Sequence, residues 1–351
     1  MIARLFNACL LRPNDLEPSH DALEVVGTFN PGAIAFGDEV VILVRVAERS
    51  RERREGFTGL PRWDPDAGLT IDWVADDELE PVDPRVVRRK RDGLFRLNFI
   101  SHLRLVRSRD GRSIDSLDEP RFGPQTPYEE FGVEDPRITR IGNWYYFTYV
   151  AVSRHGAATA LASTTDFVTF NRHGVIFYPE NKDIVLFPEQ IDQQYLALHR
   201  PNAATPFCMP EMWLARSSDL IHWGGHEYFL GGGSGWETGR IGAGAPPIRT
   251  NQGWLEIYHG NREPTAPGDV GVYSAGAILL DLDDPRRIVR QTEGAIMEPQ
   301  ADFERDGFVP NVVFPTGVVE RDDVLQVYYG AADTYVGVAE FARNELLAAL
   351  R

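Results

Sequence analysis

The sequence predicts an all-β protein, a five-bladed β-propeller that ends in a short C-terminal helix. Three segments repeat an apolar–x–Ser–x–Asp pattern, or a close variant of it, and their aspartates recur roughly every 55 residues, at Asp110, Asp166 and Asp219. Five turns rich in Asn, Asp and Gly each separate two extended segments of β-branched and aromatic residues. A helical pattern occurs only at residues 342–351. A β-sandwich is the alternative arrangement.

The five turns set the blade count. They lie at residues 37–38, 142–143, 192–194, 251–253 and 322–323, and each precedes an apolar strand. Their residues supply positive φ angles and side-chain turn bonds. Five copies of one multi-strand unit indicate a propeller, in which polar residues at the starts of the inner strands face a central pocket. We therefore expect residues 1–351 to form a single catalytic domain.

Two stretches do not follow the repeat. Residues 1–22 are expected to be a lead-in that partly wraps the last blade. Residues 49–93 are charged, contain prolines and are weakly periodic, which indicates an inserted loop or hairpin region. Its basic run at 88–91 is interpreted as a solvated face, because the chain as a whole is acidic.

The composition of the chain limits its binding partners and the cellular compartment in which we expect it. The balance of 36 basic and 52 acidic residues gives a net charge of −16, which argues against nucleic acid and anionic membranes as partners. No apolar run reaches the roughly 18 residues of a membrane span, and the N-terminus lacks a signal-peptide pattern. Cys9 and Cys208 are far apart and lack metal-ligand spacing. These observations predict a cytoplasmic protein with unpaired thiols.

The segment at residues 131–139 carries the strongest functional signal. Glu134, Asp135 and Arg137 stand directly before a strand, 144–150, that is almost wholly aromatic and β-branched. Desolvated charges cost several kcal/mol unless they are paired, so packing alone does not explain them. We interpret Asp135 as a catalytic acid, whereas Glu134 is expected on the other strand face in a structural role.

Polar residues of the other blades are candidates for the same pocket. They lie within or next to predicted strands, and together with Arg137 they are expected to contact the substrate: Asn30, Arg45, His102, Asp183, Tyr329 and Asp333. Asn30 precedes Pro31 and is equally compatible with a turn. His102 is equally compatible with a hydrogen-bonded strand histidine.

Two reactions fit these residues. Inverting glycosidic cleavage needs one acid and a nucleophile on the opposite face of the sugar. Lys182, Arg200 and His259 come from three neighbouring strands, and if they converge they would bind phosphate and favour phosphorolysis. Glu211 and Glu263 would repel phosphate and could instead activate water for hydrolysis. The residues by themselves leave both reactions open.

An ordered set of motifs resembles glycoside hydrolase family 130, the β-mannoside phosphorylases and β-mannosidases. The motifs run from about residue 23 to 340 and are FGVEDPR at 131–137, NKD at 181–183, LFPE at 186–189, HRP at 199–201, YHG at 258–260 and YGAADT at 329–334. The resemblance implies a five-bladed propeller that cleaves β-mannosidic bonds with inversion and without a metal or cofactor. The opening strands and the NKD motif are most similar to members that act on β-1,2-linked mannose.

The resemblance also implies roles for single residues. The family's acid corresponds to Asp135, which donates its proton directly or through a sugar hydroxyl, and the phosphate-binding positions correspond to Lys182, Arg200 and His259. Sugar contacts correspond to Asn30, Arg45, Asp183 and Asp333. Glu211 resembles the hydrolytic members.

We expect phosphorolysis of manno-oligosaccharides to mannose 1-phosphate, with inorganic phosphate as co-substrate, because all three basic positions are occupied. An inverting β-1,2-mannosidase is the alternative, and a non-catalytic glycan-binding propeller is a remote third. Association into a homo-oligomer remains open.

Overall fold

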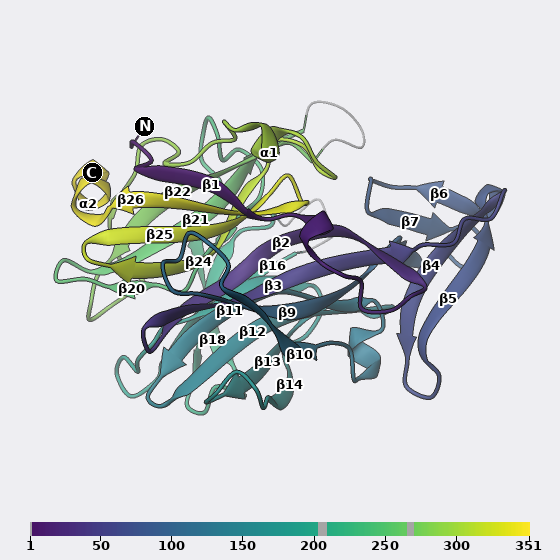
Figure 1. The fold of residues 1–351 in the computed structure, drawn as a ribbon. Coiled ribbons are helices and arrows are strands. Elements are labelled where there is room, and N and C mark those ends of the chain that lie inside the picture. The colour runs from purple at the N-terminus through teal and green to yellow at the C-terminus, as the bar shows by residue number, and fades with distance from the viewer. Residues whose placement is uncertain (1, 203–208, 265–269) are drawn as a thin grey trace.

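The computed structural model describes residues 2–202, 209–264 and 270–351, so Cys208 lies outside the described residues. Strands make up almost all of its regular secondary structure, as predicted, and within the described ranges no sheet closes on itself (Figure 1). The two α-helices of the described part are short: α1 (Asp302–Arg305) and α2 (Arg343–Ala349). The second confirms the predicted C-terminal helix.

The strand pairing divides the body into five antiparallel units, each of which starts with a hairpin. The first contains β2 (Leu23–Phe36), β3 (Glu39–Ser50), β9 (Ile100–Ser108) and β10 (Ser116–Phe122). The second contains β11 (Gly132–Ile141), β12 (Trp144–Ser153), β13 (Gly156–Thr164) and β14 (Asn171–Phe177). A parallel bridge between Gly132 and Ser101 joins these two units into one eight-stranded sheet.

The remaining units are separate sheets. The third contains β15 (Asn181–Leu186), β16 (Tyr195–Pro201), β17 (Met212–Ser217) and β18 (Gly224–Leu230). In the fourth, β19 (Ile241–Ala243) and β20 (Ile248–Arg249) both pair with β21 (Trp254–Arg262), which is followed by β22 (Val272–Leu280) and β23 (Ile288–Gln291). The fifth contains β24 (Val313–Arg321), β25 (Val324–Ala331) and β26 (Tyr335–Ala342), with β1 (Phe6–Leu11) as its outer strand.

The turns and repeats have a local physical cause. All five predicted turns join the first two strands of a unit, and Gly37, Gly142, Asp192, Gly253 and Asp322 all have positive φ there. The repeated aspartates lie directly after third strands. Asp166 Oδ1, for example, accepts hydrogen bonds from the backbone N–H groups of Val168 and Thr169. Asp281, after β22, likewise accepts hydrogen bonds from the backbone N–H groups of Asp283 and Asp284. It is a fourth copy of the repeat, in which the serine of the pattern is replaced by Leu279.

The units pack against each other through apolar faces. Leu43 and Leu105 of the first unit share a buried cluster with Phe147 and Tyr149 of the second, and Leu255 of the fourth packs in another cluster with residues of the fifth. The first strands also meet one another: β2 contacts β11 and β24, β11 contacts β15, and β15 contacts β19. Residues at the starts of these strands are thereby brought close together.

The predicted insertion at 49–93 is more ordered than a loop. It forms a hairpin of β4 (Phe57–Asp64) and β5 (Gly68–Ala75) and a small sheet of β6 (Leu79–Pro81), β7 (Val86–Arg89) and β8 (Phe95–Leu97). We call residues 51–98 the arm, because they project from the body in Figure 1. In its basic run Arg88 pairs with Glu80 and Arg89 with Asp92, as expected of a solvated face.

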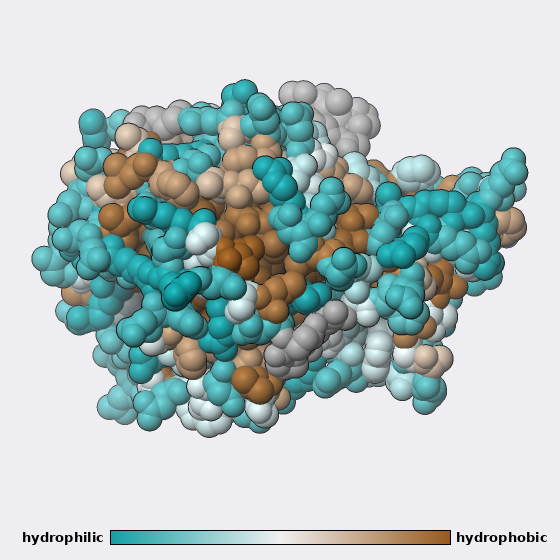
Figure 2. Space-filling model, viewed as in Figure 1, coloured by the Kyte–Doolittle hydropathy of each residue, from teal (hydrophilic) through white to brown (hydrophobic). Residues whose placement is uncertain are grey.

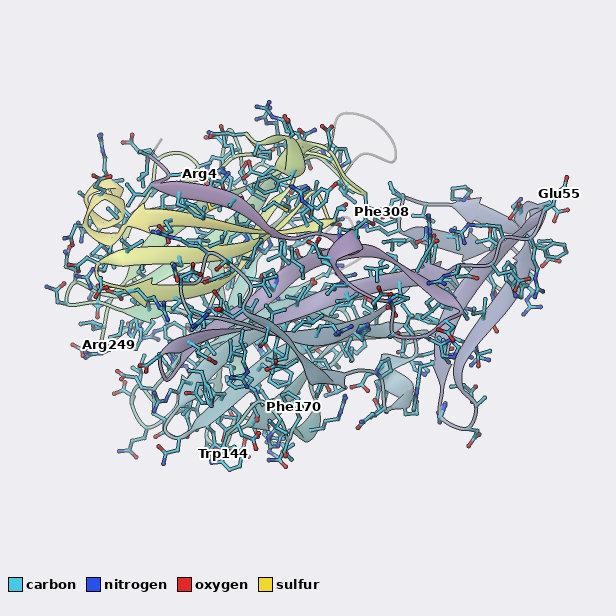
Figure 3. All side chains as sticks on the ribbon, viewed as in Figure 1. Arg4, Glu55, Trp144, Phe170, Arg249 and Phe308 are labelled. Atoms are coloured by element: carbon cyan, nitrogen blue, oxygen red, sulfur yellow. The ribbon has the colours of Figure 1, made fainter. Side chains whose placement is uncertain are left out.

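The outer surface differs in hydropathy between the arm and the centre of the body. The arm is largely hydrophilic in Figure 2, whereas hydrophobic residues gather in the hollow at the centre of that face. Side chains such as Trp144 and Arg249 project at the periphery (Figure 3). No helix in the described ranges is long and apolar enough to cross a membrane.

Candidate active site

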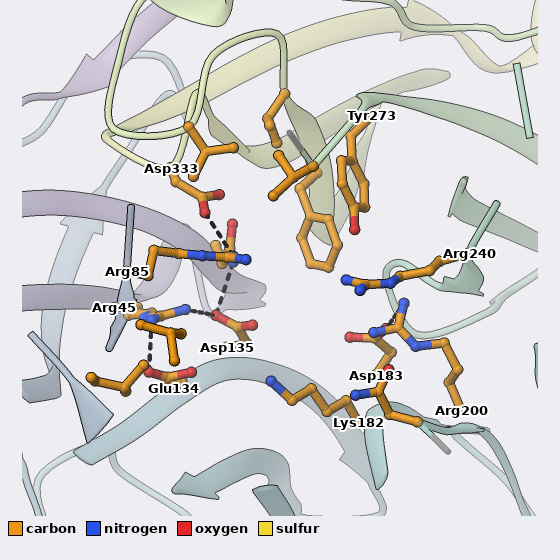
Figure 4. A pocket seen from close by; sticks show the side chains of 18 of the residues that line it. Arg45, Arg85, Glu134, Asp135, Lys182, Asp183, Arg200, Arg240, Tyr273 and Asp333 are labelled. Atoms are coloured by element: carbon orange, nitrogen blue, oxygen red, sulfur yellow. Dashed lines mark hydrogen bonds and ion pairs between the residues drawn. The ribbon is translucent and has the colours of Figure 1, made fainter. Parts of the chain in front are cut away.

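A polar pocket lies where the first strands of the units converge (Figure 4). Residues of all five units and of the arm line it. Those with polar side chains are Asn30, Arg45, Arg85, Glu134, Asp135, Lys182, Asp183, Arg200, Asn202, Arg240, Tyr273 and Asp333. Seven of the residues predicted from the sequence are in this set: Asn30, Arg45, Asp135, Lys182, Asp183, Arg200 and Asp333.

A repeated backbone irregularity directs side chains into the pocket. Asn30, Asp135 and Asp183 occupy equivalent places in β2, β11 and β15 and have φ angles of 48°, 50° and 56°. At each place the pairing register shifts, so two residues oppose one residue of the next strand. Such a bulge interrupts the alternation of strand faces. Glu134, which was expected to face away from Asp135, consequently lines the same pocket.

One end of the pocket is acidic. Arg45 holds two of its carboxylates, with Nη1 2.9 Å from Asp135 Oδ1 and Nη2 2.7 Å from Glu134 Oε1. Asn30 Nδ2 donates a second hydrogen bond of 2.9 Å to the same oxygen of Asp135. The third carboxylate, Asp333, lies 3.3 Å from Nη1 of Arg85.

The three carboxylates differ in how firmly they hold a proton. Burial raises the pKa of Asp135, but Arg45 and Arg137 outweigh it and the net shift is downward. Burial raises the pKa of Glu134, and the neighbouring Asp135 adds to this while Arg45 opposes it, so that the net shift is upward. Burial also raises the pKa of Asp333 above its usual value against the pull of Arg85 and Arg45. Among the three carboxylates, Glu134 and Asp333 therefore hold a proton more readily than Asp135.

The opposite end of the pocket is cationic. Lys182, Arg200 and Arg240 line it, and Figure 4 shows their side chains directed toward one region. Arg200 Nη1 lies 2.9 Å from Asp183 Oδ2, whereas neither Lys182 nor the side chain of Arg240 forms an ion pair within the described part of the chain. Cations without a protein partner, in a pocket, are what an anionic ligand requires.

Arg137 and His259 lie behind this end rather than in it. Arg137 is 1 % exposed and donates to Asp183 Oδ1 at 2.9 Å and to the Gly244 carbonyl at 2.9 Å. His259 is fully buried, with Nε2 3.3 Å from both Asp183 Oδ2 and Arg200 Nη1. Burial raises the pKa of Asp183, but Arg200 and Arg137 together hold it well below its usual range. Asp183 is thus a fixed anion that orients the cations around it.

Four other predicted residues do not line the pocket. His102 lies beside Glu48, with Nε2 3.6 Å from Glu48 Oε2. The Tyr329 hydroxyl oxygen lies 2.6 Å from Glu304 Oε1 and 2.7 Å from Asn7 Oδ1, and it donates its one proton within this pair. Glu211 is half-buried next to Gly231 and Tyr228. Glu263 lines a neighbouring hollow that shares Arg85 and Arg240 with the pocket.

Sequence reasoning missed two arginines of the pocket. Arg85 comes from the arm, between β6 and β7, where its basic neighbours suggested only a solvated face. Arg240 precedes β19 in a stretch of small residues, 241–245, where no neighbouring charge marks it as part of a site. Within the described residues no group of three or more His, Cys, Asp or Glu side chains could hold a metal ion.

Comparison with known proteins agrees with this geometry. Residues 75–351 match the model of glycoside hydrolase family 130, described as beta-1,4-mannooligosaccharide phosphorylase. A beta-1,2-mannobiose phosphorylase of Listeria innocua is 38% identical over 96% of this chain and 95% of its own length. A 1,2-beta-oligomannan phosphorylase of a Thermoanaerobacter species is 39% identical over 69% of this chain and 78% of its own.

The solved structures extend the likeness to three dimensions. The Listeria innocua beta-1,2-mannobiose phosphorylase, solved with beta-1,2-mannobiose, has a TM-score of 0.90 and covers 97% of this chain and 96% of its own.

Proposed function

The chain belongs to glycoside hydrolase family 130, and from this premise we propose that it cleaves β-1,2-linked mannosides by phosphorolysis, releasing mannose 1-phosphate with inversion. The observation that carries the proposal is the cationic end of the pocket, where Lys182 and Arg240 have no anionic partner among the described residues. The Listeria innocua relative that matches the chain almost end to end is a beta-1,2-mannobiose phosphorylase. Inorganic phosphate is then the co-substrate.

We further propose that the five units form a single domain with the geometry of a five-bladed propeller. The contacts of β2 with β11 and β24, of β11 with β15 and of β15 with β19 support a circular order of first strands. The β1–β26 pairing supports it as well, because it joins the two ends of the chain in one unit.

The two ends of the pocket suit the two halves of the reaction. Asp135 is our candidate for the acid that donates a proton toward the leaving oxygen, directly or through a sugar hydroxyl. Phosphate bound by Lys182, Arg200 and Arg240 would attack the anomeric carbon from the opposite side and invert it. The bond from the anomeric carbon to the leaving oxygen breaks as a bond to a phosphate oxygen forms. The proton of hydrogen phosphate restores the acid, so the reaction consumes no other reagent.

Hydrolysis is less well supported by the same geometry. A water-activating carboxylate has to reach the face of the sugar opposite the acid. Glu211 lines no part of the pocket, and Glu263 lies in the neighbouring hollow. The carboxylate at the cationic end is Asp183, which Arg137 and Arg200 hold as a fixed anion.

The test is the cleavage of β-1,2-mannobiose with and without phosphate, with mannose and mannose 1-phosphate measured separately. We expect equal amounts of the two products, formed only when phosphate is present. Two mannoses per bond at a rate independent of phosphate would replace the proposal with a mannosidase. Turnover of β-1,4-mannobiose alone would retain phosphorolysis and change the linkage.

A further inference from the structure

A second cleft lies beside the cationic end of the pocket, between the second and third units. It encloses about 560 Å³, within the size range of small-molecule sites. Asn202 lines both this cleft and the pocket, and Asn181 of the cleft directly precedes Lys182. The two spaces are therefore neighbours along the same rim.

Aromatic side chains dominate the walls of the cleft. Tyr178 follows β14 and is 83 % exposed, which is far more than core packing requires. Trp213, at the start of β17, is half-buried and meets Tyr228 edge-on at 6.1 Å. Deeper in the cleft Trp223 stacks on Phe177 at 5.6 Å. These residues offer flat apolar faces to a ligand.

Polar groups lie between the aromatic faces, and almost none is charged. Asn181 shares a hydrogen bond of 3.1–3.2 Å with His199, whose other ring nitrogen lies 3.1 Å from His226. Glu180 is the one Lys, Arg, Asp or Glu among the described residues of the lining, and one of its oxygens accepts a hydrogen bond from the Ala157 N–H. This cleft therefore suits a neutral ligand with alternating apolar faces and hydroxyl groups, which is the character of a pyranose.

We propose that this cleft is an auxiliary binding site for the distal mannosyl units of a long β-1,2-mannan chain whose terminal unit occupies the pocket. The inference rests on the proposed function and adds the substrate class, oligomannans longer than the disaccharide. The shared rim at Asn202 lets one chain reach both spaces, and the lack of lysine and arginine in the described lining separates this site from the phosphate end.

The experiment compares chain lengths in one protein. The variant Tyr178→Ala/Trp213→Ala removes two aromatic side chains from the cleft wall. Trp144→Ala is the matched control, an exposed aromatic residue at the β11–β12 turn that is absent from this cleft. The measured quantity is the ratio of kcat/KM for a β-1,2-oligomannan of more than six units to kcat/KM for β-1,2-mannobiose. We expect this ratio to fall about tenfold in the double variant and to stay at the parent value in the control.

A ratio that is unchanged in the double variant overturns the inference even when both substrates are cleaved. A parent protein that cleaves neither substrate overturns the proposed function instead. Direct binding gives an independent readout: Asp135→Asn protein, titrated calorimetrically with the oligomannan, should bind it more tightly than mannobiose. The combination of Asp135→Asn with the aromatic double variant should lose that preference. Equal affinity for both lengths before the aromatic change also rejects the auxiliary site.

Discussion

Three residues in the left-handed region of φ set the geometry of the pocket. A non-glycine residue with positive φ is uncommon, and Asn and Asp tolerate it best because their short side chains bond locally. Asn30, Asp135 and Asp183 each occupy this conformation in the first strand of a unit. The strain is offset by hydrogen bonds and ion pairs between the units, such as that from Asn30 to Asp135 and that from Arg137 to Asp183.

Replacing Asp135 with asparagine tests the acid without changing its shape. The variant keeps a side chain that tolerates positive φ and has an oxygen for Asn30 and Arg45, so we expect an unchanged circular dichroism spectrum. Loss of a general acid costs about 10²–10⁴-fold in rate, and we expect kcat to fall by that amount. A reduction of less than tenfold in a folded variant would assign the proton transfer to another group, of which Glu134 is the nearest candidate.

Lys182 tests the phosphate end. Lys182→Met keeps the apolar stem and removes the charge, and the lost charge-assisted contact predicts a rise of about 10–100-fold in KM for phosphate. The KM for mannobiose should change less, because mannobiose is neutral and Lys182 acts on Glu134 and Asp135 through its electrostatic effect. The control is Arg88→Met, an exposed cation of the arm paired with Glu80. Equal effects on both KM values would contradict an anion site at Lys182.

His199 makes stability depend on pH. Burial, and then the neighbouring His226, lower its pKa from 6.5 to about 3 in the folded protein. The unfolded chain binds the proton more tightly, so the contribution of His199 to stability is full above pH 6.5 and is lost as the pH falls toward 3. A difference of one in pKa between the folded and the unfolded chain corresponds to about 1.4 kcal/mol in the free energy of unfolding. We expect the free energy of unfolding of His199→Gln, measured in urea, to fall less between pH 7 and pH 5 than that of the parent protein. Parallel curves of this free energy against pH would contradict the role of His199.

The sequence could identify a pocket residue where the evidence for it lies in the residue's own segment. Asp135 and Lys182 stand in segments whose charge contradicts their apolar surroundings, and the sequence shows this directly. Glu134 could not be placed, because the bulge that turns it into the pocket depends on the pairing of β11 with β12. Tyr329 could not be placed either, since its hydroxyl binds Glu304 and Asn7, which are distant in sequence.

At the scale of elements, the arm is the feature that the sequence describes least well. Its strands are short and their apolar and polar residues do not alternate clearly. The sequence therefore indicated an inserted loop or hairpin but not the sheets that the arm forms. The five hairpins could be predicted because each depends on two or three turn residues. The arm also contributes a residue to the pocket. Arg85, in the turn between β6 and β7, forms an ion pair with Asp333.

Arg85→Gln tests whether the arm takes part in the site. Burial raises the pKa of Asp333, and Arg85 is the first group that opposes this, so its loss should leave Asp333 more readily protonated. We expect kcat/KM for mannobiose to fall about tenfold, the usual effect of losing a charged contact. Arg89→Gln, in the same strand as Arg88 and paired with Asp92, is the control. Unchanged kinetics would make the arm a structural appendage.

At the scale of the whole molecule, the two ends of the chain meet in one sheet. β1 supplies the outer strand of the fifth unit by pairing with β26, and Arg4 adds an ion pair of 2.5 Å to the buried Glu304. The lead-in was predicted to wrap the last unit, but which strand it would pair with could not be read from the sequence, since the partner lies more than 300 residues away. The net charge of −16 coexists with a cationic end of the pocket, because Lys182, Arg200 and Arg240 are concentrated there.

Deleting residues 2–11 tests how far the fold depends on this closure. The deletion exposes the edge of β26 and leaves Glu304 buried without Arg4, and an uncompensated buried charge alone costs about 3–5 kcal/mol. For a protein of this size we expect a melting temperature lower by about 10 °C and a greater tendency to aggregate through the free edge. Deletion of residues 2 and 3, which leaves Arg4 and β1 in place, is the control. A β1 peptide added in excess should recover part of the lost stability. Equal melting temperatures for both deletions would mean that the other four units and β24–β26 hold the fold without the N-terminal strand.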